Sequence, residues 1–113
     1  MLARQFRLRK SRDCQRVWRQ GRTLQTPELR LKFCVKNFAL PRVNIVIAKK
    51  ILKSAVQRNY LRRRLSEIIR CNFSLLPRNC DLLVICKNAK LRELDYASLT
   101  ELVTKLLQKI SHF

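Results

Sequence analysis

Residues 43–50 read V-N-I-V-I-A-K-K and residues 55–67 read A-V-Q-R-N-Y-L-R-R-R-L-S-E, and these two stretches decide the fold. The first is a run of mostly β-branched apolar residues, which predicts a strand over 43–48 that is covered on both faces of a sheet. The second predicts a helix over about 54–71, because Leu61, Leu65, Ile68 and Ile69 recur at helical spacing. A strand followed closely by an amphipathic helix indicates a sheet that is covered by helices.

The sequence before these stretches predicts a short amphipathic helix over 12–20. We expect Ser11 to cap its first turn and Gly21 to mark its end. Three residues share one face of this helix: Cys14, Val17 and Trp18. The helix therefore has one face that packs or binds and one that is solvated.

The segment from Leu29 to Lys36 alternates between apolar and mostly basic residues, which predicts a strand. Its apolar face carries Leu29, Leu31, Phe33 and Val35, and its other face carries Arg30, Lys32, Cys34 and Lys36. The second face is too basic for a dry core, so we expect it to be wet. Residues 37–42 are expected to form the turn of a hairpin that leads into the next strand.

The last third of the chain predicts one more strand, over 82–86, and a final helix capped by Asp95. The core stripe expected for this helix is Tyr96, Leu99, Leu102, Val103, Leu106, Leu107 and Ile110, with Glu101 and Lys105 paired on its surface. The order α-β-β-α-β-α predicts an α+β two-layer sandwich with a small mixed sheet and a βαβ crossover. We expect residues 1–113 to form a single domain.

The net charge of +19, from 26 Lys and Arg against 7 Asp and Glu, indicates a polyanionic partner. Nucleic acid fits better than membrane, because no window approaches 18 consecutive apolar residues and the N-terminus lacks a signal peptide. The five cysteines form no C-x-x-C pair, so we expect reduced core thiols in a cytoplasmic protein.

The chain offers no constellation for autonomous catalysis. The sole histidine, His112, is the penultimate residue, and the acids, Asp81 among them, are scattered without pattern. The cysteines lie too far apart for a zinc site. We therefore expect no catalytic residue and no tightly bound metal.

Phosphate-binding chemistry is concentrated between residues 49 and 64. Seven cations lie in these sixteen residues, and Glu67 is the only acid nearby, whereas a solvated helix face usually mixes signs. Arginine binds phosphate bidentately and lysine adds a less directional attraction. The cluster comprises Lys49, Lys50, Lys53, Arg58, Arg62, Arg63 and Arg64.

The strand with its paired lysines, followed by A-V-x-R-N-x-x-R-R-x-x-x-E, resembles the signature of the bacterial ribonuclease P protein subunit. The resemblance extends to R-L-R-K-S-R-D-C-Q-R-V-W-R-Q-G (7–21), to the strand that begins with Asp81, and to L-D-Y-A-S-L (94–99). It implies a non-catalytic subunit of an endoribonuclease that removes the 5′ leader of precursor tRNA. It also implies Mg²⁺ held mainly by the RNA subunit, and a left-handed crossover between the parallel strands.

The resemblance assigns two binding surfaces. The residues expected to face the RNA subunit are Lys49, Lys50, Arg58, Asn59, Arg62 and Arg63, to which the basic cluster adds Lys53. The residues expected near the precursor leader are Cys14, Trp18, Lys32 and Cys34, to which the strand alternation adds Arg30 and Lys36. The second surface would combine an aromatic ring with cations, as single-stranded RNA binders do.

Five positions depart from the family pattern. Tyr60 and Ser66 replace frequent arginines, Cys14 replaces a frequent phenylalanine, and glycines are frequent at the positions of Asn44 and Leu52. Tyr60 either stacks on a base or packs beside Cys71, and packing is favoured; Trp18 either packs in the core or stacks on a base. The alternative function is that of a ribosome-associated or other structural RNA-binding protein.

Overall fold

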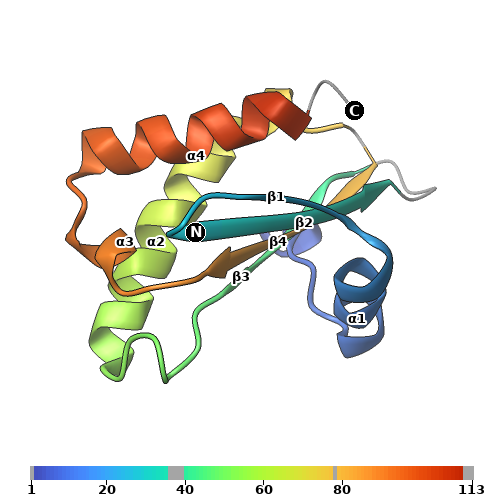
Figure 1. Ribbon diagram of the computed structural model, residues 1–113. Coiled ribbons are helices and arrows are strands. Elements are labelled where there is room, and N and C mark those ends of the chain that lie inside the picture. Colours follow the sequence, from blue (N-terminus) through green and yellow to red (C-terminus); the bar gives the residue numbers. More distant parts are fainter. Residues whose placement is uncertain (1, 36–39, 78, 111–113) are drawn as a thin grey trace.

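The computed structural model describes residues 2–35, 40–77 and 79–110, and Figure 1 shows a four-stranded sheet with helices on both faces. The helices are η1 (Arg4–Phe6), α1 (Ser11–Gln20), α2 (Ala55–Cys71), η2 (Phe73–Leu75), α3 (Lys90–Glu93) and α4 (Tyr96–Ile110). The strands are β1 (Arg22–Gln25), β2 (Leu29–Val35), β3 (Arg42–Val46) and β4 (Cys80–Cys86). Five elements were predicted after Gly21, namely the strand from Leu29, the strands over 43–48 and 82–86, and the two long helices, and all five are confirmed within about two residues.

The sheet is mixed, with the strand order β1-β2-β4-β3. β4 pairs antiparallel with β2 and parallel with β3, so α2 forms the crossover of a βαβ unit. The predicted α+β class with a small mixed sheet is therefore confirmed. The predicted hairpin between β2 and β3 is wrong, because β4 lies between them, and the hairpin of this sheet joins β1 to β2.

The main core lies between one face of the sheet and the helices α2 and α4, which Figure 1 shows on the same side. The predicted stripe of α2 is confirmed, since Leu61, Leu65, Ile68 and Ile69 are all buried. The stripe of α4 is confirmed from Leu99 to Ile110, with Leu102 partly buried. Tyr96 is 48% exposed and is not a core residue, because it begins the helix beyond the edge of the core.

Helix α1 packs on the opposite face of the sheet, against β2 and β4. A second, small cluster of Leu8, Val17 and Leu83 lies beneath it. Gly21 ends the helix as predicted, for a steric reason: a Cβ there would lie 2.4 Å from the Val17 carbonyl oxygen and 3.0 Å from that of Phe33. The missing side chain thus lets α1 end directly against β2.

The helix caps are partly as predicted. The Asp95 carboxylate accepts a hydrogen bond from the Ser98 amide at 3.1 Å, and Ser54 accepts one from the Gln57 amide at 3.3 Å. Ser11 does not cap α1, because it is the first helical residue and Lys10 occupies the cap position. The helix begins one residue earlier than expected, and Asp13 lies in its first turn.

Three strand predictions need correction. β1 was not predicted, because Leu24 is its only apolar residue. β3 is an edge strand of the four-stranded sheet and not a central one, and Val46 is 39% exposed. Val35 follows the predicted alternation but is 64% exposed, because it lies at the end of its strand.

None of the five cysteines is in a disulfide, but they are not all core residues as predicted. Cys80 and Cys86 are buried, Cys14 and Cys34 are half-buried, and Cys71 is exposed. Burial raises the pKa of the Cys86 thiol. Among the described residues, no helix is both long and apolar enough to cross a membrane.

Candidate nucleic-acid interface

The turn between β3 and α2 exposes three lysines that the sequence predicted as RNA contacts: Lys49, Lys50 and Lys53. The turn is tight, since the amides of Ile51 and Leu52 both bond to the carbonyl of Ala48. Leu52 is buried and anchors the turn on the core. The lysines are therefore held at one end of the sheet, beside the start of α2.

Arg58 braces this turn from the first part of α2. One terminal nitrogen of its guanidinium donates to the carbonyls of Leu52 at 2.8 Å and Lys53 at 2.9 Å. These hydrogen bonds hold the half-buried side chain against the turn and not over the apolar stripe of α2. The position of Arg58 near the start of the helix allows this. Its remaining N–H groups are the ones that an RNA phosphate could use.

Asn59, Arg62 and Arg63 share a face of α2, as the helical spacing predicted. Arg62 donates to the Asn59 carboxamide oxygen at 2.9 Å, while Asn59 and Arg63 are exposed. One turn later, Glu67 is paired with Arg70, whose hydrogen bond lowers the pKa of the Glu67 carboxyl. Glu67 therefore neutralises Arg70, and in the described part of the chain it forms no ion pair with the cations nearer the start of α2.

Trp18 and Lys32 meet beside α1. The Lys32 ammonium lies 5.4 Å from the centroid of the indole ring, and it donates to the Thr23 hydroxyl at 3.3 Å. The indole is 49% exposed. Of the two alternatives left open by the sequence, burial of Trp18 in the core is therefore wrong, and its ring is accessible to a ligand.

The sheet face continues past α1 through Arg30, Ile85 and Val46. The register places Arg30 opposite Ile85 and Ile85 opposite Val46, so all three lie on this face. Arg30 donates to the Gln25 side chain at 3.2 Å. The sequence missed Val46 and Ile85, because their strands were expected to be covered on both faces. Lys36, the last residue predicted for this surface, lies outside the described residues.

Cys14 of α1 and Cys34 of β2 each contact a polar group of another element. Cys14 Sγ accepts from the Asn44 amide at 3.4 Å, and Cys34 Sγ accepts from Arg16 at 3.4 Å. Both thiols are half-buried. Their role beside the precursor leader therefore stays a prediction.

A buried carboxylate that the sequence left without a role joins α1 to the sheet. Asp81 has no exposed surface, and its oxygens accept from Arg42 at 3.0 and 2.9 Å and from Arg16 at 2.5 Å. Arg42 also lies 3.3 Å from Asp13 of α1. The hydrogen bond with Asp81 is the main reason that the pKa of Arg42 is raised. Asp81 was missed because burial beside two arginines is a property of the assembled sheet.

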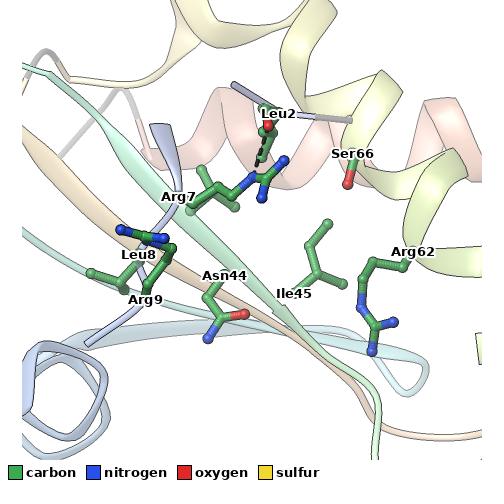
Figure 2. Close-up of a pocket in the computed structure, with 9 residues that line it drawn as sticks. Leu2, Arg7, Leu8, Arg9, Asn44, Ile45, Arg62 and Ser66 are labelled. Carbon is green, nitrogen blue, oxygen red and sulfur yellow. Dashed lines mark hydrogen bonds between the residues drawn. The ribbon is translucent and has the colours of Figure 1, made fainter. Parts of the chain in front are cut away.

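The two predicted surfaces meet at the outer edge of β3, where the N-terminal segment pairs with Val43. A hollow of about 300 Å³ opens there, lined by residues of the N-terminal segment, β3 and α2. Figure 2 shows Arg9 on one side of it and Arg62 on the other, with Asn44 and Ile45 between them. Asn44 contacts Cys14, and Arg62 contacts Asn59, so the hollow connects the leader surface to the basic face of α2.

Tyr60 is 46% exposed, which contradicts the expectation that it packs beside Cys71. Its ring lies between cations of two elements, with the guanidinium carbon of Arg92 at 4.6 Å from its centroid and that of Arg64 at 5.4 Å. Arg64 also donates to the Leu94 carbonyl at 2.9 Å. Tyr60 therefore helps to fasten α2 to the α3–α4 region through cation–π contacts.

The carboxylates are largely occupied by contacts of their own. Asp13 and Asp81 lie beside arginines, Glu67 and Glu101 are paired on helix surfaces, and Asp95 caps α4. Within residues 2–35, 40–77 and 79–110, no three His, Cys, Asp or Glu side chains lie close enough to share a metal ion.

Comparison with known proteins identifies one family. A family model described as Ribonuclease P matches residues 2–111. The ribonuclease P protein component of Roseiflexus castenholzii is 33% identical over 108 residues, covering 96% of this chain and 88% of that protein. That of Pasteurella multocida is 35% identical over 107 residues, covering 95% of this chain and 88% of that protein. The RNase P protein from Thermotoga maritima superposes with a TM-score of 0.81 at 31% identity, covering 92% of this chain and 96% of that one.

Proposed function

This chain belongs to the ribonuclease P protein family and is a subunit of an RNA-containing endoribonuclease, and we propose that it binds the catalytic RNA subunit and the 5′ leader of precursor tRNA. In this role it acts as one RNA-binding domain that assists removal of the leader. It does so in the cytoplasm, where its five free thiols would stay reduced.

The observation that carries the proposal is the basic face of α2 together with the lysine turn. Asn59, Arg63 and the three lysines are exposed, while Arg58 and Arg62 are each fixed by one hydrogen-bonding arm. A guanidinium held on one side presents its other N–H groups in a fixed direction, which suits bidentate phosphate binding. This surface is proposed to bind the RNA subunit.

The leader is proposed to lie on the other face of the sheet, beside α1. Trp18 offers a half-exposed ring, Lys32 and Arg30 offer charge, and Val46 offers an apolar surface. An aromatic ring combined with cations binds single-stranded RNA with little sequence preference. Such a surface suits a leader whose sequence differs from one precursor to another.

The catalytic Mg²⁺ ions are proposed to be held by the RNA subunit. Mg²⁺ prefers oxygen ligands in octahedral geometry, usually one or two carboxylates together with phosphates and water. Asp81 and Glu67 do not fit that role, because Asp81 is buried against two arginines and Glu67 is paired with Arg70. The protein contributes cations and an aromatic ring instead.

The direct test is to measure binding of a ribonuclease P RNA to the purified chain, with a transfer RNA of similar charge density as the competitor. We expect the ribonuclease P RNA to bind at least tenfold more tightly at physiological salt, and a double variant Arg62→Ala, Arg63→Ala to lose most of that preference. Equal affinity for the two RNAs would favour a general RNA-binding role over the proposed one.

A further inference from the structure

The hollow at the outer edge of β3 has a defined shape. The N-terminal segment runs parallel to β3 at an isolated bridge between Arg7 and Val43, and the Leu8 amide bonds to the Val43 carbonyl at 2.9 Å. The Arg7 side chain donates back to the Leu2 carbonyl at 2.9 Å and closes the segment into a loop. This wall of the hollow is therefore held by one backbone hydrogen bond to β3 and by one side-chain hydrogen bond within the N-terminal segment.

One wall of the hollow is apolar. Leu2 and Ile45 line it, and they are 5% and 8% exposed. A volume of about 300 Å³ is at the lower limit of the pockets that hold small organic ligands. The hollow is thus large enough for a planar group, which would pack on these two side chains.

The rim of the hollow is cationic. Arg7, Arg9 and Arg62 are among the described residues that line it, and none of those residues carries a carboxylate. Arg9 is exposed, and Figure 2 shows it across the hollow from Arg62. The charge therefore favours a ligand that carries a phosphate beside its planar group.

Asn44 adds a directional polar group. Its amide nitrogen donates to Cys14 Sγ at 3.4 Å, which orients the carboxamide. Figure 2 shows the carboxamide oxygen on the side of Ile45 and Arg62. An acceptor beside an apolar wall selects a planar group that carries an amino group at its edge, as adenine does.

The small side chain of Ser66 leaves space in the hollow. It lines the hollow from α2 and is 3% exposed, so a long side chain at this position would enter the hollow. Asn44 of β3 and Ser66 of α2 lie in different elements, yet they line the same space. The hollow is therefore formed jointly by side chains of these two elements.

From these contacts we propose that the hollow is a pocket for one unstacked ribonucleotide. Its base lies on Leu2 and Ile45 with an amino group donating to Asn44, and its phosphate lies between Arg9 and Arg62. The proposal rests on the proposed function, because RNA is the partner in both. It adds to that function one site that recognises a single nucleotide.

The first test titrates the ¹⁵N-labelled full chain with AMP, UMP and inorganic phosphate at constant ionic strength, followed by NMR. AMP is expected to shift the side-chain amide of Asn44 and the backbone amide of Ile45. It is expected to bind about fivefold more tightly than UMP, the amount that one additional hydrogen bond supplies. If AMP leaves these resonances in place, or if phosphate binds as tightly as AMP, there is no nucleotide pocket.

Variants sharpen this test. Ser66→Arg fills the hollow and is expected to abolish the shifts, whereas Ser66→Ala keeps the room and the binding. Asn44→Leu is expected to reduce the affinity for AMP to that for UMP. Lys109→Gln, which removes an exposed charge from α4, is the matched control and should change nothing. Unaltered binding of AMP to folded Ser66→Arg would overturn the proposal.

The source of the nucleotide is distinguished in the assembled particle. If the pocket holds a nucleotide of the RNA subunit, Ser66→Arg weakens binding of ribonuclease P RNA in the absence of precursor. If it holds a leader nucleotide, the same variant weakens binding of precursor to the assembled particle. A loss in neither assay would overturn the proposal. The AMP titration needs no ribonuclease P RNA, so failure of the proposed function would be seen separately.

Discussion

The guanidinium of Arg16 in α1 lies 2.5 Å from the buried carboxylate of Asp81 in β4, 65 residues further along the chain. The same carboxylate accepts two hydrogen bonds from Arg42 of β3. Asp81 thus holds α1 against the sheet, next to the face where Trp18 and Lys32 meet. A structural ion pair therefore sets the position of the proposed leader surface.

The substitution Asp81→Asn should destabilise the fold strongly. It keeps the shape of the side chain but leaves Arg16 and Arg42 without the charge that they contact. Breaking a buried ion pair costs about 3–5 kcal/mol, and because both arginines are partly exposed we expect a loss of about 3 kcal/mol. Urea unfolding measures this loss, and the matched control is Glu101→Gln, which breaks an exposed pair and should cost less than about 0.5 kcal/mol. Equal losses in the two variants would show that Asp81 is not a structural clamp.

The double variant Trp18→Ala, Lys32→Ala should weaken binding of leader-bearing precursor about tenfold or more. Stacking on an aromatic ring is worth about 1–3 kcal/mol per base, and about 1.4 kcal/mol is tenfold in affinity. The fold should survive, because the indole is 49% exposed. Affinity of the assembled particle for precursor and for mature tRNA is the measurement.

Mature tRNA supplies the internal control for this prediction, because it lacks the leader. Its affinity should be almost unchanged in the double variant. If both RNAs lose affinity equally, the leader does not lie beside Trp18.

The double variant Arg62→Ala, Arg63→Ala should lower the slope of log affinity for ribonuclease P RNA against log salt by about two, because each arginine that no longer binds a phosphate lowers it by about one. Arg58 is better tested alone, because its replacement also removes the hydrogen bonds that brace the Leu52 and Lys53 carbonyls. Lys109→Ala, on α4, is the control for a general reduction of charge. An unchanged slope in the folded double variant would remove the basic face of α2 from the interface.

The cap of α4 should make stability depend on pH. Hydrogen bonds from the Ser98 hydroxyl and amide hold the pKa of Asp95 below its usual value. A carboxyl with a lowered folded pKa stabilises the fold above its unfolded pKa of about 3.9, and this contribution is lost as the pH falls through the folded pKa. Asp95→Ala should therefore lower the free energy of unfolding at pH 7 and have little effect near pH 2. A difference that is the same at both pH values would contradict this assignment.

The elements with strong periodicity could be predicted from sequence. The spacing of Leu61, Leu65 and Ile68 predicted α2, and the alternation from Leu29 predicted β2. In an element with one buried face, apolar residues recur with the period of a helix or a strand. β1 has no alternation of apolar residues that could predict it, since it is a four-residue edge strand with a single apolar side chain. Local pattern therefore identified the elements that carry the core.

Strand pairing could not be predicted in the same way. β2 and β3 are neighbours in sequence, but β4, which follows α2, inserts between them. The pairing of Asp81 with Arg16 and Arg42 depends on that insertion, and so does the exposure of Val46 at the sheet edge. The basic face of α2 could thus be predicted, because it lies on one helix. The surface beside α1 was predicted incompletely, because it spans several strands.

We propose that this chain assists a catalytic RNA, and a cleavage assay tests that claim. Purified chain is mixed with a bacterial ribonuclease P RNA and a precursor tRNA at a low magnesium concentration at which the RNA alone is nearly inactive. We expect the chain to restore cleavage at the 5′ end of the mature tRNA, and rigorously RNA-free protein to cut nothing. Absence of rescue by folded protein, or magnesium-dependent cleavage by the protein alone, would contradict the claim.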